Sequence, residues 1–247
     1  TVLSGLAERF AAEDLTTLCV NTRGHDFVSL SRSSLGPQRL GAAYETVGQC
    51  HLDVNSWCDF LSSRGYRRLG LLGHSLGAVK AVFAATQAPH PIVKLLMALS
   101  PPRLSFAEFN SGPRKKLFRN TMERAQAWVD QGKPETLIRA TYPFPLLITA
   151  AGYLEKYGPN ERYNILRFAH QLPCPALFTF GQQELSQGGV AFAGLPEELR
   201  NLPSGSQPLE TRTIAGADHM YTGRVDLLAD QILQCLGQFG DDLNGCR

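Results

Sequence analysis

Residues 68–78 read Arg68-Leu-Gly-Leu-Leu-Gly-His-Ser-Leu-Gly-Ala78, and this stretch decides the fold. Its first half is an apolar run of strand length, and the small and aliphatic residues of 78–85 favour a helix. At the junction, Gly73-His-Ser-Leu-Gly77 fits the pattern G-x-S-x-G. A strand that turns sharply into a helix, with a serine at the turn, exposes the serine hydroxyl above the edge of a sheet. We therefore predict a strand–serine–helix unit centred on Ser75.

The two glycines of this motif are predicted to allow a close approach of the backbone. A turn this tight brings the chain near itself on both sides of the serine, so a side chain at Gly73 or Gly77 is expected to clash. The serine would also lie at the N-terminus of the following helix, whose dipole favours developing negative charge. The bare pattern occurs by chance in roughly one chain in ten of this length and composition. The strand before it and the helix after it make the match more specific.

Length and composition limit the class of protein. The chain has 247 residues, of which 43% are hydrophobic and 19% charged, values typical of one large globular α/β domain. A net charge of +2 gives no indication of a nucleic-acid partner, and no apolar run reaches the ~18 residues of a membrane span. The six cysteines form no C-x-x-C pair. Free thiols in a reducing, cytoplasmic compartment and no zinc site are therefore expected.

Helix-forming and strand-forming segments alternate along much of the chain. Helical periodicity is found at 2–12, 41–63 and 225–239, and apolar strand-like runs at 16–21, 92–99, 175–180 and 209–214. Alternation of strand and helix is the signature of a parallel sheet with helices on both faces. The predicted fold class is therefore α/β, with a mostly parallel, doubly wound sheet.

Residues 101–172 interrupt this alternation. They contain 11 Lys and Arg against 6 Asp and Glu, and 10 of the 22 aromatic residues. An amphipathic helix is indicated by apolar residues that repeat at helical spacing, namely Leu117, Phe118, Met122, Ala125 and Val129. We expect this segment to be a helical insertion packed over the sheet, with residues 1–100 and 173–247 forming the core of the domain.

Three loops that follow predicted strands carry Ser75, Glu184 and His219, in that order. In a parallel sheet such loops meet at the carboxyl ends of the strands. A serine hydroxyl needs an imidazole to accept its proton, and the imidazole needs a carboxylate to fix its tautomer and stabilise its protonated form. The backbone N–H of Leu76 would then donate to the oxyanion. This chemistry requires no metal ion and no organic cofactor.

With this order of serine, acid and histidine, the chain resembles the α/β-hydrolase superfamily, specifically its serine esterase and lipase-like members. The resemblance rests on Asn21-Thr-Arg-Gly-His-Asp26, Gly73-His-Ser-Leu-Gly77, Gly181-Gln-Gln-Glu184 and Gly216-Ala-Asp-His219. It implies the α/β-hydrolase fold, a helical cap at residues 101–172, and a small-molecule ester or other acyl compound as substrate. The oligomeric state is not implied.

Each candidate has an alternative role. Ser75 could be only a helix N-cap, and His219 could be a loop histidine with no catalytic role. His219 is nevertheless the histidine that follows the last predicted strand, unlike those at positions 25, 51, 74, 90 and 170. The acid is the least determined, since aspartate is commoner at this place in the family. Asp218 adjoins His219 and Asp226 lies beyond the loop, so Glu184 is predicted by elimination. Arg23, His25 and Asp26 are expected to make structural hydrogen bonds in the loop beside the site.

The start of the chain departs from the family pattern. Further strands normally precede the first helix, and the loop after the last of them supplies a second oxyanion N–H. We expect the given sequence to lack these N-terminal strands. The leading hypothesis is a serine hydrolase that cleaves a carboxylic ester through an acyl-enzyme. The alternatives are a thioesterase, amidase or acyltransferase with the same triad, or a non-catalytic ligand-binding homologue.

Overall fold

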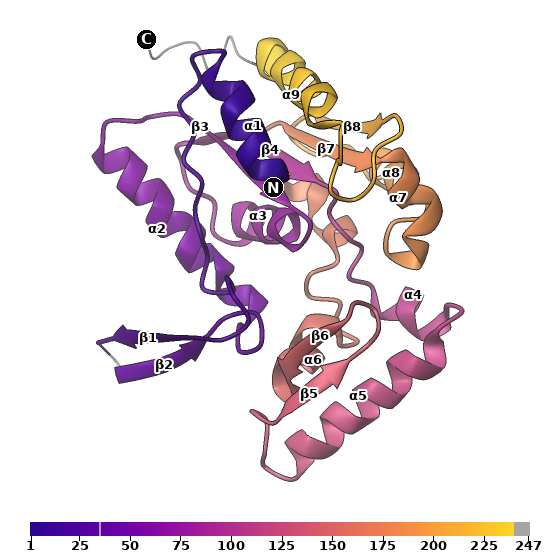
Figure 1. Ribbon diagram of the computed structural model, residues 1–247. Helices are drawn as coiled ribbons and strands as arrows, with labels where there is room; N and C mark the ends of the chain where they lie inside the picture. Colours follow the sequence, from indigo (N-terminus) through magenta and orange to yellow (C-terminus); the bar gives the residue numbers. More distant parts are fainter. Residues whose placement is uncertain (35, 240–247) are drawn as a thin grey trace. The chain divides into compact units, whose positions relative to one another are not determined.

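The computed structural model describes residues 1–34 and 36–239. The chain divides into two compact units. The first contains residues 1–20, 54–103 and the part from 165 onwards, and the second contains residues 21–53 and 104–164. Residues 21–53, which we expected in the core, thus cluster with the segment expected to form the insertion. The elements are labelled in Figure 1.

A parallel four-stranded sheet forms the centre of the first unit. Its strands, in the order β3-β4-β7-β8, are β3 (Leu69–His74), β4 (Val93–Leu99), β7 (Ala176–Gly181) and β8 (Leu209–Ile214). All three pairings are parallel, and the register aligns Ala98 of β4 with Gly73 on one side and Phe178 on the other. The mostly parallel sheet predicted from the sequence is confirmed, and the strands predicted at 92–99, 175–180 and 209–214 agree with the observed ones to within one residue at each end.

Helices cover both faces of this sheet. On one face, α1 (Val2–Ala11) and α9 (Val225–Phe239) lie together (Figure 1) and bury Leu6 and Ile232 against Leu95 and Leu177. Side chains alternate along a strand, so Leu96 points to the opposite face, where α3 (Leu76–Gln87) packs on β3 and β4. The residues at 78–85 of that helix, most of them small or branched, are all buried, as the doubly wound arrangement predicts.

Two predicted elements differ from the structure. The strand expected at 16–21 is wrong: residues 12–28 belong to no helix or strand, and Leu18 and Val20 are about 40% exposed. A strand requires a neighbour that accepts its hydrogen bonds, and no strand of the described residues pairs with this segment. The helix expected from Gly41 begins later, as η1 (Val47–Gln49) and α2 (Cys50–Ser63). Gly41 has a φ of +99°, which is incompatible with a right-handed helix.

Short helices complete the first unit. They follow β7 or lead into it, and they are α7 (Gln182–Gln187), η4 (Gly189–Ala191), α8 (Leu195–Arg200), η2 (Ile165–Arg167) and η3 (Ala169–Gln171). Of these, α7 begins directly at the carboxyl end of β7, so its first turn lies at the same edge of the sheet as the end of β3. This edge carries the candidate site.

The second unit combines helices with two antiparallel hairpins. The hairpins are β1–β2 (Ser29–Ser33 and Gly36–Leu40) and β5–β6 (Leu137–Ala140 and Leu146–Thr149), and the helices are α4 (Phe106–Ser111), α5 (Lys115–Asp130) and α6 (Ala150–Tyr157). Its core is an aromatic cluster in which Phe118 contacts Phe109, Tyr142 and Tyr153. The amphipathic helix predicted in this region is α5, although Leu117 is 41% exposed. The β5–β6 hairpin was not anticipated by the expectation of a purely helical segment.

Candidate active site

The serine predicted as nucleophile lies on a strained turn between β3 and α3. Ser75 has φ 55° and ψ −124°, a conformation that costs a residue with a side chain about 1–3 kcal/mol. Its amide N–H donates to the carbonyl oxygen of Leu99, the last residue of β4, at 2.8 Å. This bond holds the turn against the neighbouring strand and leaves Ser75 half-buried at the carboxyl end of the sheet.

The two glycines of the motif differ in their tolerance of a side chain. A Cβ atom at Gly73 would lie 2.3 Å from the carbonyl oxygen of Gly77, so the close approach predicted at Gly73 is confirmed. A Cβ atom at Gly77 would meet no heavy atom of the described chain within 4 Å, beyond its neighbours and its own helix backbone. The clash predicted at Gly77 is therefore wrong, because that position faces open space.

The three side chains predicted from the sequence form one hydrogen-bonded series. Ser75 Oγ lies 3.0 Å from His219 Nε2, and His219 Nδ1 lies 2.7 Å from Glu184 Oε2. An ionised carboxylate only accepts hydrogen bonds, so Nδ1 carries the proton and Nε2 presents its lone pair to the serine hydroxyl. In this tautomer the imidazole can accept the proton of the serine.

Glu184 is held by its own loop as well as by the histidine. It lies in the first turn of α7 and is 4% exposed. Its second oxygen, Oε1, accepts the backbone N–H of Gly181 at 3.1 Å, so both carboxylate oxygens have a partner. The backbone N–H of Gln183 donates to the carbonyl oxygen of Ala217 at 2.9 Å. The acid loop and the histidine loop are thereby joined through their backbones, two residues before His219.

The other two carboxylates considered for the acid have different partners. Asp218 Oδ1 accepts the amide N–H groups of Met220 at 3.0 Å and Thr222 at 2.9 Å. The bond from the Thr222 amide holds the pKa of Asp218 below its usual value. Asp226 is exposed and pairs with Arg9 at 3.2 Å. Asp218 therefore shapes the loop, and the partner of the histidine is the residue predicted by elimination.

Two residues hold the histidine loop in place, and neither was assigned this role from the sequence. His74 Nε2 lies 2.8 Å from the backbone carbonyl oxygen of His219. The hydroxyl of Tyr221 lies 2.8 Å from both Ser100 Oγ and Thr179 Oγ1, and burial raises the pKa of this tyrosine well above its usual value. These contacts come from the carboxyl ends of β3, β4 and β7. No sequence spacing relates His74, Ser100 or Thr179 to the histidine loop. The one sequence signal for these contacts is the expectation that the carboxyl ends of parallel strands meet at one edge of the sheet.

The segment 21–26, part of the resemblance, belongs to the second unit. Arg23 donates to the carboxylate of Asp53 from Nε and Nη2 at 3.0–3.1 Å and to Gln49 at 2.8 Å. His25 contacts Asp26 at 3.2 Å, and both side chains are more than half exposed. The structural hydrogen bonds expected for this loop are thus present at Arg23.

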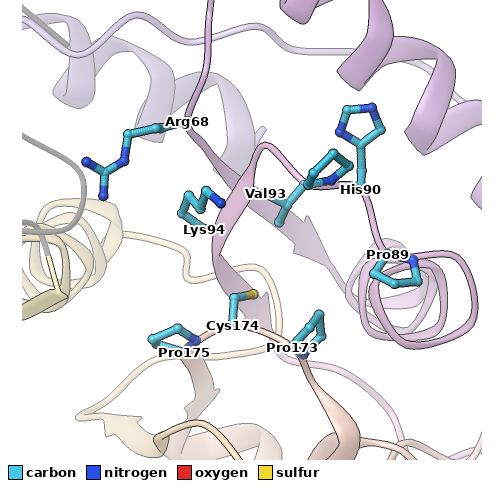
Figure 2. Close-up of a pocket in the computed structure, with 9 residues that line it drawn as sticks. Arg68, Pro89, His90, Val93, Lys94, Pro173, Cys174 and Pro175 are labelled. Carbon is cyan, nitrogen blue, oxygen red and sulfur yellow. The ribbon is translucent and has the colours of Figure 1, made fainter. Parts of the chain in front are cut away.

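A pocket of about 710 Å³ lies at the other end of the sheet from the triad. Figure 2 shows its lining, which includes Arg68, Lys94 and Cys174, residues at or just before the amino ends of β3, β4 and β7. Burial raises the pKa of the Cys174 thiol to about 11, which disfavours the reactive thiolate. This pocket is therefore separate from the candidate site at the carboxyl ends of the strands.

Across 1–34 and 36–239, no group of three or more His, Cys, Asp or Glu side chains is arranged to hold a metal ion. No helix within those ranges combines the length and apolar character needed to cross a membrane. The cysteines they contain are free thiols, and Cys246 lies outside the described residues.

Solved structures with a similar course of the chain identify the fold. An α/β hydrolase, GrgF from Penicillium sp. sh18, aligns with 97% of this chain and 85% of its own at a TM-score of 0.67 and 15% identity. An esterase from Thermogutta terrifontis aligns with 97% of this chain and 85% of its own, at a TM-score of 0.58 and 16% identity. A monoacylglycerol lipase from Paleococcus ferrophilus aligns with 91% of this chain and 87% of its own, at a TM-score of 0.54 and 16% identity. No protein-family profile and no curated protein sequence matches the chain.

The topology and the site together define the class of protein. A parallel sheet is covered by helices on both faces, and a serine on a strained strand-to-helix turn lies beside a histidine at the carboxyl ends of the strands. The chain has the α/β-hydrolase fold, as its sequence resemblance implied.

Proposed function

We propose that this protein is a serine hydrolase that cleaves a carboxylic ester through an acyl-enzyme intermediate. The observation that carries the proposal is the continuous series of hydrogen bonds from Ser75 through His219 to Glu184, at 3.0 Å and 2.7 Å. The fold by itself does not fix the reaction, because one fold supports many activities. The proposal therefore rests on the chemistry of these three side chains.

The reaction follows from the tautomer of the histidine. His219 Nε2 accepts the hydroxyl proton of Ser75 while Oγ attacks the carbonyl carbon of the ester. As the tetrahedral intermediate collapses, the imidazolium returns this proton to the oxygen of the departing alcohol, and the acyl group remains on Oγ. A water molecule then gives a proton to Nε2 and attacks the acyl-enzyme. The carboxylic acid leaves, and the serine hydroxyl regains its proton.

Two groups stabilise the charges that develop in these steps. The buried carboxylate of Glu184, close to Nδ1, stabilises the positive charge of the imidazolium. The backbone N–H of Leu76 is the candidate donor to the oxyanion. Leu76 is the first residue of α3, where amide N–H groups have no partner inside the helix and the helix dipole favours negative charge.

The test compares the parent protein with Ser75→Ala on p-nitrophenyl butyrate. Turnover should fall by roughly 10⁴ or more in the variant, because the nucleophile is lost while the rest of the site remains. The matched control is Ser186→Ala, since this serine is exposed on α7 and its hydroxyl donates to the carbonyl oxygen of Gln183 in the same turn. Ester turnover that Ser75→Ala leaves unchanged would contradict the proposal.

The acyl donor distinguishes the related activities. Rates on an oxygen ester, a thioester and an amide of the same acyl group separate esterase, thioesterase and amidase, and an added alcohol reveals acyl transfer. The proposal expects the oxygen ester to react fastest and an acyl group to be found on Ser75 by mass spectrometry after rapid quenching. A protein that binds the ester with neither turnover nor an acyl adduct would be a non-catalytic homologue.

A further inference from the structure

The residue before the nucleophile reaches the backbone of the base. His74 is the last residue of β3, and its Nε2 lies 2.8 Å from the carbonyl oxygen of His219. The two imidazole rings are 4.9 Å apart between centroids and inclined at 40°. The ring of His74 therefore occupies the space between the serine turn and the histidine loop, and its contact to the loop is made with the backbone.

The direction of this hydrogen bond follows from its partner. A carbonyl oxygen only accepts, so His74 Nε2 must carry a proton. Burial lowers the pKa of His74, which favours the neutral ring with a single proton. That proton is then fixed on Nε2, while Nδ1 remains unprotonated. His74 is thereby a donor of defined tautomer, as His219 is through its own bond to Glu184.

This bond closes a ring that contains the reacting atoms. This closed path runs from Ser75 Oγ through a hydrogen bond to His219 Nε2, and along that residue to its backbone carbonyl. A second hydrogen bond leads to His74 Nε2, and the backbone returns from His74 to Ser75. Displacement of the histidine loop from the serine turn must break one of the two hydrogen bonds. The loop is also held by Tyr221, which bonds to the ends of β4 and β7, and by the backbone bond from Gln183 to Ala217, whereas His74 joins the loop backbone to β3, the strand that leads into the nucleophile.

We infer that His74 is a positioning residue of the hydrolase, a donor that holds the backbone of His219 at the distance proton transfer requires. This inference rests on the proposed function. The physical reason is that the efficiency of general-base catalysis depends on the heavy-atom distance between the two groups. Loss of the donor should lower kcat and leave KM nearly unchanged, since the bond of His74 is made to the backbone of the histidine loop.

A matched pair of variants separates the donor from the shape of the side chain. His74→Gln places an amide N–H at the same number of bonds from the backbone as Nε2, whereas His74→Met has a similar length and no donor. We expect kcat on p-nitrophenyl butyrate to fall about tenfold in His74→Met and to stay within about threefold of the parent in His74→Gln. The control is His90→Met, because His90 bonds to Asp59 at the amino end of the sheet. A kcat in His74→Met equal to that of the parent would overturn the inference.

Long-range ¹H–¹⁵N spectra of the histidine rings provide a test that does not depend on activity. The His74 signal, identified by its loss in His74→Gln, should show the tautomer protonated at Nε2. A ring protonated only at Nδ1 would overturn the inference even if His74→Met were inactive, and it decides the matter if that variant fails to fold. A parent that neither hydrolyses esters nor forms an adduct at Ser75 would contradict the proposed function alone, and the tautomer would still show whether the bond exists.

Discussion

Replacement of Glu184 by glutamine tests how the acid acts on the histidine. In the parent, one carboxylate oxygen accepts from His219 Nδ1 at 2.7 Å and the other accepts from the Gly181 amide at 3.1 Å. Glutamine has one oxygen for these two donors. If its oxygen stays with Gly181, its NH₂ group faces Nδ1 and forces the proton onto Nε2. A histidine in that tautomer cannot accept the proton of Ser75.

The size of the effect follows from the same geometry. A hydrogen bond to a charged group contributes about 1.5–3 kcal/mol, which corresponds to roughly 10–150-fold in rate. The unfavourable tautomer adds to this loss, so we expect kcat to fall about 10²–10⁴-fold in Glu184→Gln. Glu184→Asp keeps the charge but withdraws it by about one methylene, or ~1.5 Å, and its kcat should lie between those of the parent and Glu184→Gln.

The assay is the initial rate on p-nitrophenyl butyrate, with the melting temperature measured to exclude loss of folding. The matched controls are Asp218→Asn and Asp226→Asn. Asparagine at 218 can still accept the Met220 and Thr222 amides, and the side chain of Asp226 is 86% exposed. Both should stay within a few-fold of the parent. A Glu184→Gln variant with near-parental kcat, together with a large loss in either control, would refute the assignment of the acid.

Three further predictions concern stability. Gly73→Ala should destabilise the protein by about 2–4 kcal/mol, because its Cβ atom meets the backbone at Gly77, whereas Gly77→Ala should be tolerated; urea unfolding of the two variants compares them directly. Tyr221→Phe leaves two buried hydroxyls without their shared partner and should cost about 1–3 kcal/mol in the same measurement; no change would mean that water replaces the hydroxyl. Because the Thr222 amide lowers the pKa of Asp218, its carboxylate stabilises the fold at pH values above the usual aspartate pKa of about 3.9, and this contribution is lost as the pH falls further. The melting temperature of the parent should therefore decline more steeply in acid than that of Asp218→Asn, and parallel curves would contradict this.

The central part of the fold could be predicted because its sequence patterns are local. The run at 92–99 is apolar on both faces, as a strand buried between two helical layers must be, and it forms β4. The segment at 16–21 has a similar pattern but forms no strand, since pairing depends on a neighbour that the pattern itself does not reveal. Gly77 shows the same limit at a single residue: the motif predicts a close approach of the backbone, but a Cβ atom at this position faces open space.

The three side chains of the candidate site could be predicted from the sequence, but the contacts that hold the histidine loop in place could not. Ser75, Glu184 and His219 each follow a recognisable strand, so the topology of a parallel sheet brings them together. The bond from His74 to the backbone of His219 links residues 145 positions apart, and its geometry depends on the rotamer of one ring. The composition of the second unit was similarly inaccessible, because residues 21–53 join 104–164 through contacts distant in sequence.

Covalent labelling with a fluorophosphonate probe tests the proposed serine nucleophile most directly, because phosphonylation requires a serine hydroxyl activated by a neighbouring base. The parent protein and Ser75→Ala are treated with the probe, digested and compared by peptide mass spectrometry. We predict modification at Ser75 in the parent, and no modification of any serine in the variant. Labelling of undiminished extent in Ser75→Ala, or a folded parent that remains unlabelled at Ser75, would contradict it.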